Sequence, residues 1–147
     1  MSEIYLEVGV VVVRRSTGGP WADVSWRPVV VLAAPPPLEA GAFLSSASGE
    51  DLFYAGAAEL CLHVSATSHY RDNLRSGRPS VWVAIAAANN LVCVQAVTVD
   101  PYEGEALAEI YGECLDAAPM PAALRDAVSR FVAAHHVERA FVKRKRT

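Results

Sequence analysis

The stretch that decides the fold is VGVVVVRRSTGGPWADVSWRPVVVL, residues 8–32. It consists of two Val-rich runs separated by Gly18, Gly19 and Pro20. β-Branched runs on either side of turn-forming residues are typical of a β-hairpin with a long loop. A hairpin by itself is at best marginally stable in water, so later strands and helices must cover its apolar faces.

Length, charge and cysteine content limit the class of protein. A chain of 147 residues predicts one domain with a single core. Cys61, Cys93 and Cys114 are far apart and predict reduced thiols in a cytoplasmic protein. No apolar run approaches the roughly 18 residues of a membrane helix, so the sequence predicts no membrane association.

The charges are unevenly distributed along the chain. Four of the 13 basic residues lie at 143–146, which leaves nine against 16 acidic residues elsewhere. We predict a globular domain over residues 1–140 and a basic tail over 141–147. The tail is interpreted either as a docking segment or as a solvated terminus without a role. Its candidate partner-binding residues are Phe141, Lys143, Arg144, Lys145 and Arg146.

The loop of the hairpin is rich in aromatic and charged residues. Trp21 and Trp26 near Asp23 and Arg27 could form a stacking platform with hydrogen-bonding partners, and all four are candidate partner-binding residues. In the alternative interpretation, one Trp covers the core, and Arg27 stacks on it or pairs with Asp23.

The middle of the chain predicts a connector and then a strand. Three prolines at 35–37 interrupt the second run, and the Ser-rich residues 45–51 predict a turn. Residues 52–64 predict a long strand with a bulge or bend at Gly56. Its expected core face comprises Leu52, Tyr54, Ala58, Leu60 and Leu62.

Residues 65–76 predict a short helix capped by Ser65 or Thr67. Arg71 and Arg75 would share one face, with Arg78 just beyond the end. Like charges at this spacing repel each other unless a bound anion neutralises them, so the three arginines are a candidate anion site. Solvated arginines, or pairs with acidic residues, are the alternative.

The second half predicts a further hairpin and two helices. Residues 80–88 and 91–99 flank a turn at Asn89 and Asn90, and both nearly continuous apolar arms are expected to be covered, with Cys93 buried. A helix should begin at Pro101. Its expected apolar stripe is Leu107, Ile110 and Tyr111. The last helix should bury Leu124, Val128, Phe131, Val132 and His135, with His136 turned away.

The four histidines are weak metal candidates. His135 and His136 are adjacent and do not converge as an i, i+4 pair does, and His63 and His69 lie elsewhere in the chain. No combination of residues indicates a nucleophile with its base or a pair of catalytic acids. We therefore assign no catalytic residue, no metal and no cofactor, and four cations on an acidic body argue against nucleic-acid binding.

Taken together, the predicted elements indicate an α+β fold. We expect a mainly antiparallel twisted sheet of about five strands, packed against a C-terminal helix and two short helices.

The motifs VGVVVVRR, PWADVSWRPVVVL, LHV with TSHYRDNL, PSVWV, DPYEG and PMPAAL with FVAAHHVERAFVKRKR resemble a family of small uncharacterised bacterial proteins, a domain of unknown function. The resemblance covers nearly the whole chain. It implies a genomic setting beside molybdenum-dependent formate dehydrogenase and its maturation genes, and no activity. This chain departs from the family pattern at Ala66 and Ala140, where an acid and a proline are expected, which weakens a catalytic role for His63 and the short helix.

We therefore expect a non-catalytic accessory protein for formate dehydrogenase assembly, maturation or regulation. Its partner would be a formate dehydrogenase subunit or maturation factor, with a homodimer as a further option. The alternative is a binder of, or enzyme acting on, an anionic pterin or nucleotide cofactor, using Arg71, Arg75 and Arg78 with the tryptophans. A nucleic-acid-binding regulator ranks third.

Overall fold

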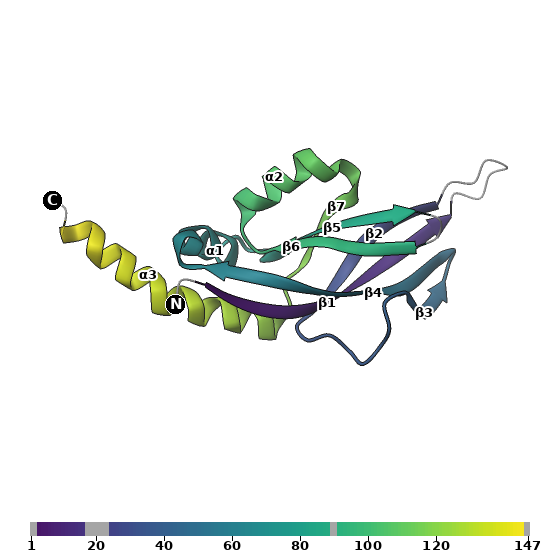
Figure 1. The fold of residues 1–147 in the computed structure, drawn as a ribbon, viewed down its shortest axis with the longest axis horizontal. Helices are drawn as coiled ribbons and strands as arrows, with labels where there is room; N and C mark the ends of the chain where they lie inside the picture. The colour runs from purple at the N-terminus through teal and green to yellow at the C-terminus, as the bar shows by residue number, and fades with distance from the viewer. Residues whose placement is uncertain (1–2, 17–23, 89–90, 146–147) are drawn as a thin grey trace.

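A computed structural model describes residues 3–16, 24–88 and 91–145, with side chains described as far as His136. The strands are antiparallel and the fold belongs to the α+β class, as predicted (Figure 1). Within these described ranges, seven strands, rather than about five, form two sheets. The elements are β1 (Glu3–Ser16), β2 (Val24–Leu32), β3 (Ala42–Ala47), β4 (Glu50–His63), α1 (Thr67–Leu74), β5 (Ser80–Ala88), β6 (Leu91–Thr98), α2 (Pro101–Tyr111), β7 (Leu115–Pro119) and α3 (Ala122–Lys145).

The two sheets pack together around one core. The larger has the order β2-β1-β4-β3 and the smaller the order β6-β5-β7. Because β4 also lies beside β6, and β2 beside β7, the sheets form a flattened, barrel-like arrangement. Its interior is filled mainly by Val, Leu and Ile, each contributing roughly 1.5–3 kcal/mol when fully buried. Fully buried members include Val8, Val10, Val12, Leu60, Leu62, Val81 and Val83.

The hairpin predicted from residues 8–32 is confirmed. β1 and β2 are antiparallel neighbours, with Gly9 opposite Leu32 and Ser16 opposite Val24. β1 also pairs along its whole length with β4, so it is a central strand. Its apolar even positions face the core, as their alternation indicates.

The bulge predicted at Gly56 is present and reverses part of the face assignment. Val10 pairs with Gly56 and Val11 with Tyr54, so Ala55 is the extra residue of β4. Gly56 has a φ of 135°, which a side chain would disfavour. Because of the bulge, Ala55 joins the core, whereas Tyr54 lies against Gly9 on the outer face instead of sharing a face with Leu60.

The Ser-rich segment forms a strand that the sequence analysis missed. Residues 45–47 belong to β3, which pairs with the first residues of β4, and the turn is limited to Ser48 and Gly49. The edge position explains why the pattern was weak. With one neighbour and mostly exposed side chains, β3 needs no apolar alternation.

The helices cover the sheets in a way that corrects two expectations. α2 begins at Pro101 as predicted, but it meets β5 through the buried Gly104, and Ile110 is 72% exposed. α1 has Ala66 at its N-cap, without a side-chain hydrogen bond; the ring of His63 instead accepts from the Ser65 backbone N–H in the preceding 3-10 turn.

The C-terminal helix buries the predicted apolar stripe. Leu124, Val128, Phe131 and Val132 are all buried, and α3 also packs against α1. The helical backbone continues to Lys145, through most of the segment predicted as a tail. The side chains from residue 137 onward lie outside the described part, so the functional division at residue 140 stays a prediction.

Candidate functional site

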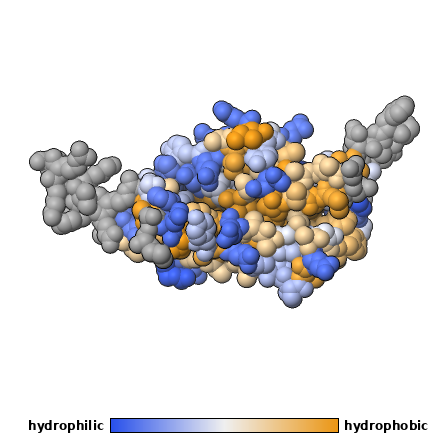
Figure 2. Space-filling view, in the orientation of Figure 1, coloured by the Kyte–Doolittle hydropathy of each residue, from blue (hydrophilic) through white to orange (hydrophobic). Residues whose placement is uncertain are grey.

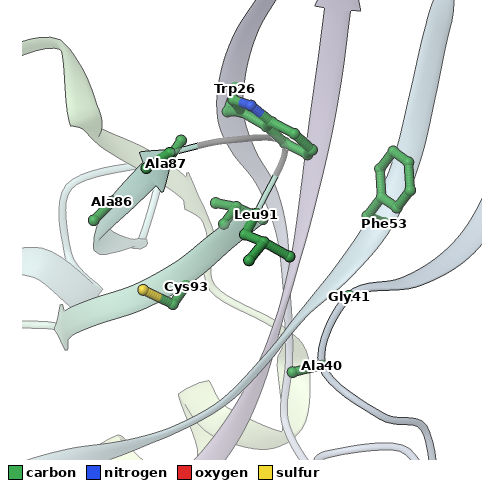
Figure 3. A pocket seen from close by; sticks show the side chains of 10 residues that line it. Trp26, Ala40, Gly41, Phe53, Ala86, Ala87, Leu91 and Cys93 are labelled. Carbon is green, nitrogen blue, oxygen red and sulfur yellow. The ribbon is translucent and has the colours of Figure 1, made fainter.

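An apolar groove opens between the two sheets, beside the end of β5 and the start of β6. Its volume is about 580 Å³. Apolar residues gather on this face along β6 (Figure 2). In the groove, Trp26 of β2 and Phe53 of β4 face Leu91 of β6 (Figure 3). The full lining consists of Trp26, Ala40, Gly41, Phe53, Ala86, Ala87, Ala88, Leu91, Val92 and Cys93.

Strand lengths explain why the core is open at this end. β7 pairs with β5 only from Ser80 to Ala84, so β5 continues to Ala88 without that neighbour. In the larger sheet, Trp26 pairs with Arg14, and Phe53 pairs with Val12. These positions continue the inward-facing side of β1, so the two aromatic rings belong to the inner face. The small alanines of β5 do not fill the space opposite them.

A charged pair stands beside the aromatic rings. The centroids of Trp26 and Phe53 are 5.6 Å apart, and the Arg14 guanidinium lies 4.9 Å from the Phe53 centroid and 5.7 Å from that of Trp26. Arg14 Nη2 donates to Asp51 Oδ2 at 2.7 Å. Hydrogen bonds from Ser46 and Arg14 lower the pKa of Asp51 below its ordinary value. The pair anchors Arg14 as a stacking cation.

The groove side of β6 differs from the predicted buried arm. Leu91 is 73% exposed, and Cys93 is exposed and lines the groove, whereas the sequence analysis expected it to be buried. The expectation was wrong because continuous apolar strands are covered on both faces only where layers exist on both sides. Beyond Ile85, the β5–β6 hairpin extends past its covering elements and Ala86, Ala87 and Ala88 are exposed.

The predicted partner-binding residues have different positions. Trp26 lines the groove, and Arg27 forms an ion pair with Asp116 of β7, with its Nη2 2.7 Å from Oδ2. Trp21, Asp23 and Arg146 lie outside the described residues. The side chains of Phe141, Lys143, Arg144 and Lys145 also lie outside the described part.

Arg71, the first residue of the predicted anion site, contacts α3. Its Nη1 is 2.8 Å from His136 Nε2, and its buried Nε has no hydrogen-bond partner among the described side chains. A guanidinium only donates, so His136 accepts at Nε2, and its Nδ1, 3.4 Å from Thr67 Oγ1, carries the proton. His136 therefore faces α1, contrary to the prediction. Arg75 and Arg78 are exposed.

The arginines and Trp26 are not brought together. α1 follows His63, which pairs with Glu3 at one end of β1, whereas Trp26 pairs with Arg14 near the other end. Eleven residue steps along a strand span roughly 35 Å. A single pterin or nucleotide contacting both groups is therefore not the arrangement that the geometry favours.

The histidines have separate roles in the described structure. His69 Nδ1 lies 3.1 Å from Asp100 Oδ2, and the ring of His135 contacts that of Phe131 at a tilt of 45°, with centroids 4.5 Å apart. His63 Nδ1 lies 2.7 Å from Ser65 Oγ. Among the described residues, no three His, Cys, Asp or Glu side chains gather as metal ligands.

The arrangement defines a small α+β protein with an open apolar groove, a type of site suited to binding. The chain belongs to a family of proteins of unknown function (DUF3305), whose model matches residues 7–145. No curated protein and no solved structure matches the chain. Within the described residues, no helix combines the length and apolar character needed to span a membrane.

Proposed function

We propose that the protein is a non-catalytic accessory protein that binds a formate dehydrogenase subunit or maturation factor. The observation that supports binding is the exposed apolar groove between Trp26, Phe53 and Leu91. Leu91 is exposed beside the half-buried rings of Trp26 and Phe53, and large apolar side chains that gather at a concave surface are typical of protein-recognition sites. The formate dehydrogenase setting is supported by the sequence resemblance alone.

The groove is suited to recognition because its walls are already in place. Trp26 and Phe53 are partly buried against the core, and Arg14, fixed by Asp51, stacks on both rings. Preorganised aromatic walls lose little conformational entropy when a partner binds. Aromatic residues in such positions are the type that most often dominates binding energy. The binding energy would therefore come mainly from desolvation of these two rings.

The test is coexpression of the tagged full chain with the formate dehydrogenase subunits and maturation factors of the same organism. A complex should copurify, and its affinity is measured with the purified partner by titration calorimetry. Ala87→Arg places a charge on an exposed groove position, and we expect it to weaken binding by about tenfold or more.

Ala57→Arg is the matched control, because Ala57 is an exposed alanine of β4 outside the groove. It should bind as the wild type does. Absence of a complex with every subunit and maturation factor would refute the formate dehydrogenase proposal. Equal weakening by the two substitutions would refute the groove as the contact surface.

A further inference from the structure

We infer that the partner enters the groove as an extended, uncharged apolar segment that adds a strand to the free edge of β6. This inference rests on the proposed function as a protein-binding protein and specifies the class of segment that is bound.

The first step is that β6 has an unpaired edge. It is the terminal strand of the smaller sheet, and its only hydrogen-bonded strand partner in the described structure is β5. β4 lies beside β6 without pairing with it, and the groove lies between Phe53 of β4 and the first residues of β6. Alternate residues of a strand direct their backbone N–H and C=O groups to each side, so this edge presents unused donors and acceptors. An added strand satisfies such groups by β-augmentation.

The second step locates the groove along this edge. Leu91, Val92 and Cys93 are successive residues of β6, and all three line the groove. Successive side chains of a strand point to opposite faces, so a surface on one face would contact only alternate residues. Ala86, Ala87 and Ala88 of β5, which pair with these residues, line the groove as well, so the groove runs around this end of the paired strands and reaches the edge of β6. Gly41 and Phe53 form its opposite wall.

The third step concerns the natural protection of edges. Exposed edge strands commonly carry Lys, Pro or inward-pointing charges that prevent pairing with other chains. β6, with the sequence LVCVQAVT, contains none of these residues. Its first half therefore remains open to pairing with another strand.

The fourth step is charge complementarity. None of the lining residues is charged, and the three arginines of β1 and β2 are already paired, Arg14 with Asp51, Arg15 with Glu50 and Arg27 with Asp116. A charged segment would lose hydration without gaining an ionic partner. The small side chains of Ala86, Ala87 and Ala88 leave room for aromatic or branched aliphatic residues of the segment.

The experiment selects binders from a phage-displayed library of random 12-residue peptides on the immobilised full chain. The inference expects uncharged sequences with apolar residues at every second position. The best synthetic peptide is then compared with two analogues. One is N-methylated at two alternate backbone positions, and the other at the two positions that follow them, so that each analogue has N–H groups blocked along one side of the strand. If the peptide pairs with β6, the analogue whose blocked N–H groups face β6 should bind about 30-fold more weakly than the parent peptide. The other analogue should bind with nearly the parent affinity.

Two variants locate the site. Leu91→Lys should abolish measurable peptide binding, whereas Ile110→Lys should not change it; the two side chains are 73% and 72% exposed, so neither change disturbs the core. Far-UV circular dichroism verifies that both variants are folded. Enrichment of no peptide, equal affinity of both N-methylated forms and the parent peptide, or indifference to Leu91→Lys would each overturn the inference.

A small-molecule occupant is distinguished in the same series. If the neutral dye N-phenyl-1-naphthylamine binds in a Leu91-dependent manner and no peptide displaces it, the groove is a ligand site and the inference fails. The proposed function fails separately. A formate dehydrogenase partner whose binding does not depend on Leu91 refutes only the β6 site, and peptide binding without such a partner refutes only the formate dehydrogenase assignment.

Discussion

At the contact between α2 and β5, replacing Gly104 by Ala is expected to lower the free energy of unfolding, although helix propensity by itself would raise it. Gly104 is buried in α2, and an ideal Cβ at this position would lie 2.8 Å from Trp82 Cγ and 2.9 Å from Cδ2. These atoms belong to the rigid indole ring, so a rotation about a terminal bond cannot remove the clash. In Gly104→Ala, either the ring or the whole helix must move.

The magnitude follows from two opposing effects. In a helix interior, Ala is favoured over Gly by about 1 kcal/mol. Overpacking a well-packed contact costs about 1–3 kcal/mol. The steric cost is the larger of the two at a distance below 3 Å, so we expect Gly104→Ala to lower the free energy of unfolding by about 1 kcal/mol. For a domain of this size, that corresponds to a decrease in Tm of about 3 °C.

Urea unfolding followed by far-UV circular dichroism measures this difference. The same substitution in a Trp82→Ala background provides the control, because the indole is then absent and only helix propensity remains. There, Gly104→Ala should raise the free energy of unfolding by about 1 kcal/mol. The reasoning is refuted if Gly104→Ala is at least as stable as the wild type, or if its effect is the same in both backgrounds.

Three further predictions concern buried and titrating polar groups. Asn73 is buried, and its side-chain amide forms hydrogen bonds with Ser80 N, Ser80 O and Val99 O at 2.8–3.0 Å. Asn73→Ala should therefore lower the free energy of unfolding by about 3 kcal/mol, whereas the control Asp72→Ala, at an exposed neighbouring residue, should change it by less than about 0.5 kcal/mol. Effects of similar size in the two variants would contradict the assigned contacts. Asp100 accepts from the Tyr102 and Glu103 backbone N–H groups at the start of α2, so Asp100→Ala should cost about 1 kcal/mol in thermal unfolding, and Asp100→Asn should retain most of the cap; equal losses would show that capping is not the cause. The pKa of Asp51 is lowered from 3.8 by Ser46 and Arg14, so its contribution to stability is present above that value and is lost as the pH falls further. Unfolding measured at a series of pH values should therefore show a smaller decrease below about pH 4 for Asp51→Asn than for the wild type, and an unchanged slope would contradict the contribution of this carboxylate.

Much of the fold could be predicted because its signals are local. The Val runs on either side of residues 17–23 indicated the first hairpin, and the apolar stripe from Leu124 to Val132 indicated the last helix. Asp100 and Pro101 marked the start of α2, and Gly56 marked the bulge. In each case, the residue that gives the signal also determines the local backbone conformation.

The groove could be predicted only in part. Trp26 was a candidate from its chemistry, but its partners Phe53 and Arg14 are distant in the sequence and are aligned by the pairing of β1 with β2 and β4. The exposure of Leu91 and Cys93 could not be predicted, because apolar residues show the same sequence pattern in a covered strand and in an uncovered one. The alanine run at 86–88 was the available signal, since small residues leave space beside them.

The sequence by itself determined the α+β class, most of the elements and much of the core, because hydrophobic periodicity and turn chemistry act over a few residues. Only the tertiary structure decided that Tyr54 is buried against Gly9 on the side of the sheet away from Leu60, that α2 docks through Gly104 and that β6 borders an open groove. These features depend on where one strand ends beside another. That relation is set by the closure of two sheets around a shared core, and no single segment contains it.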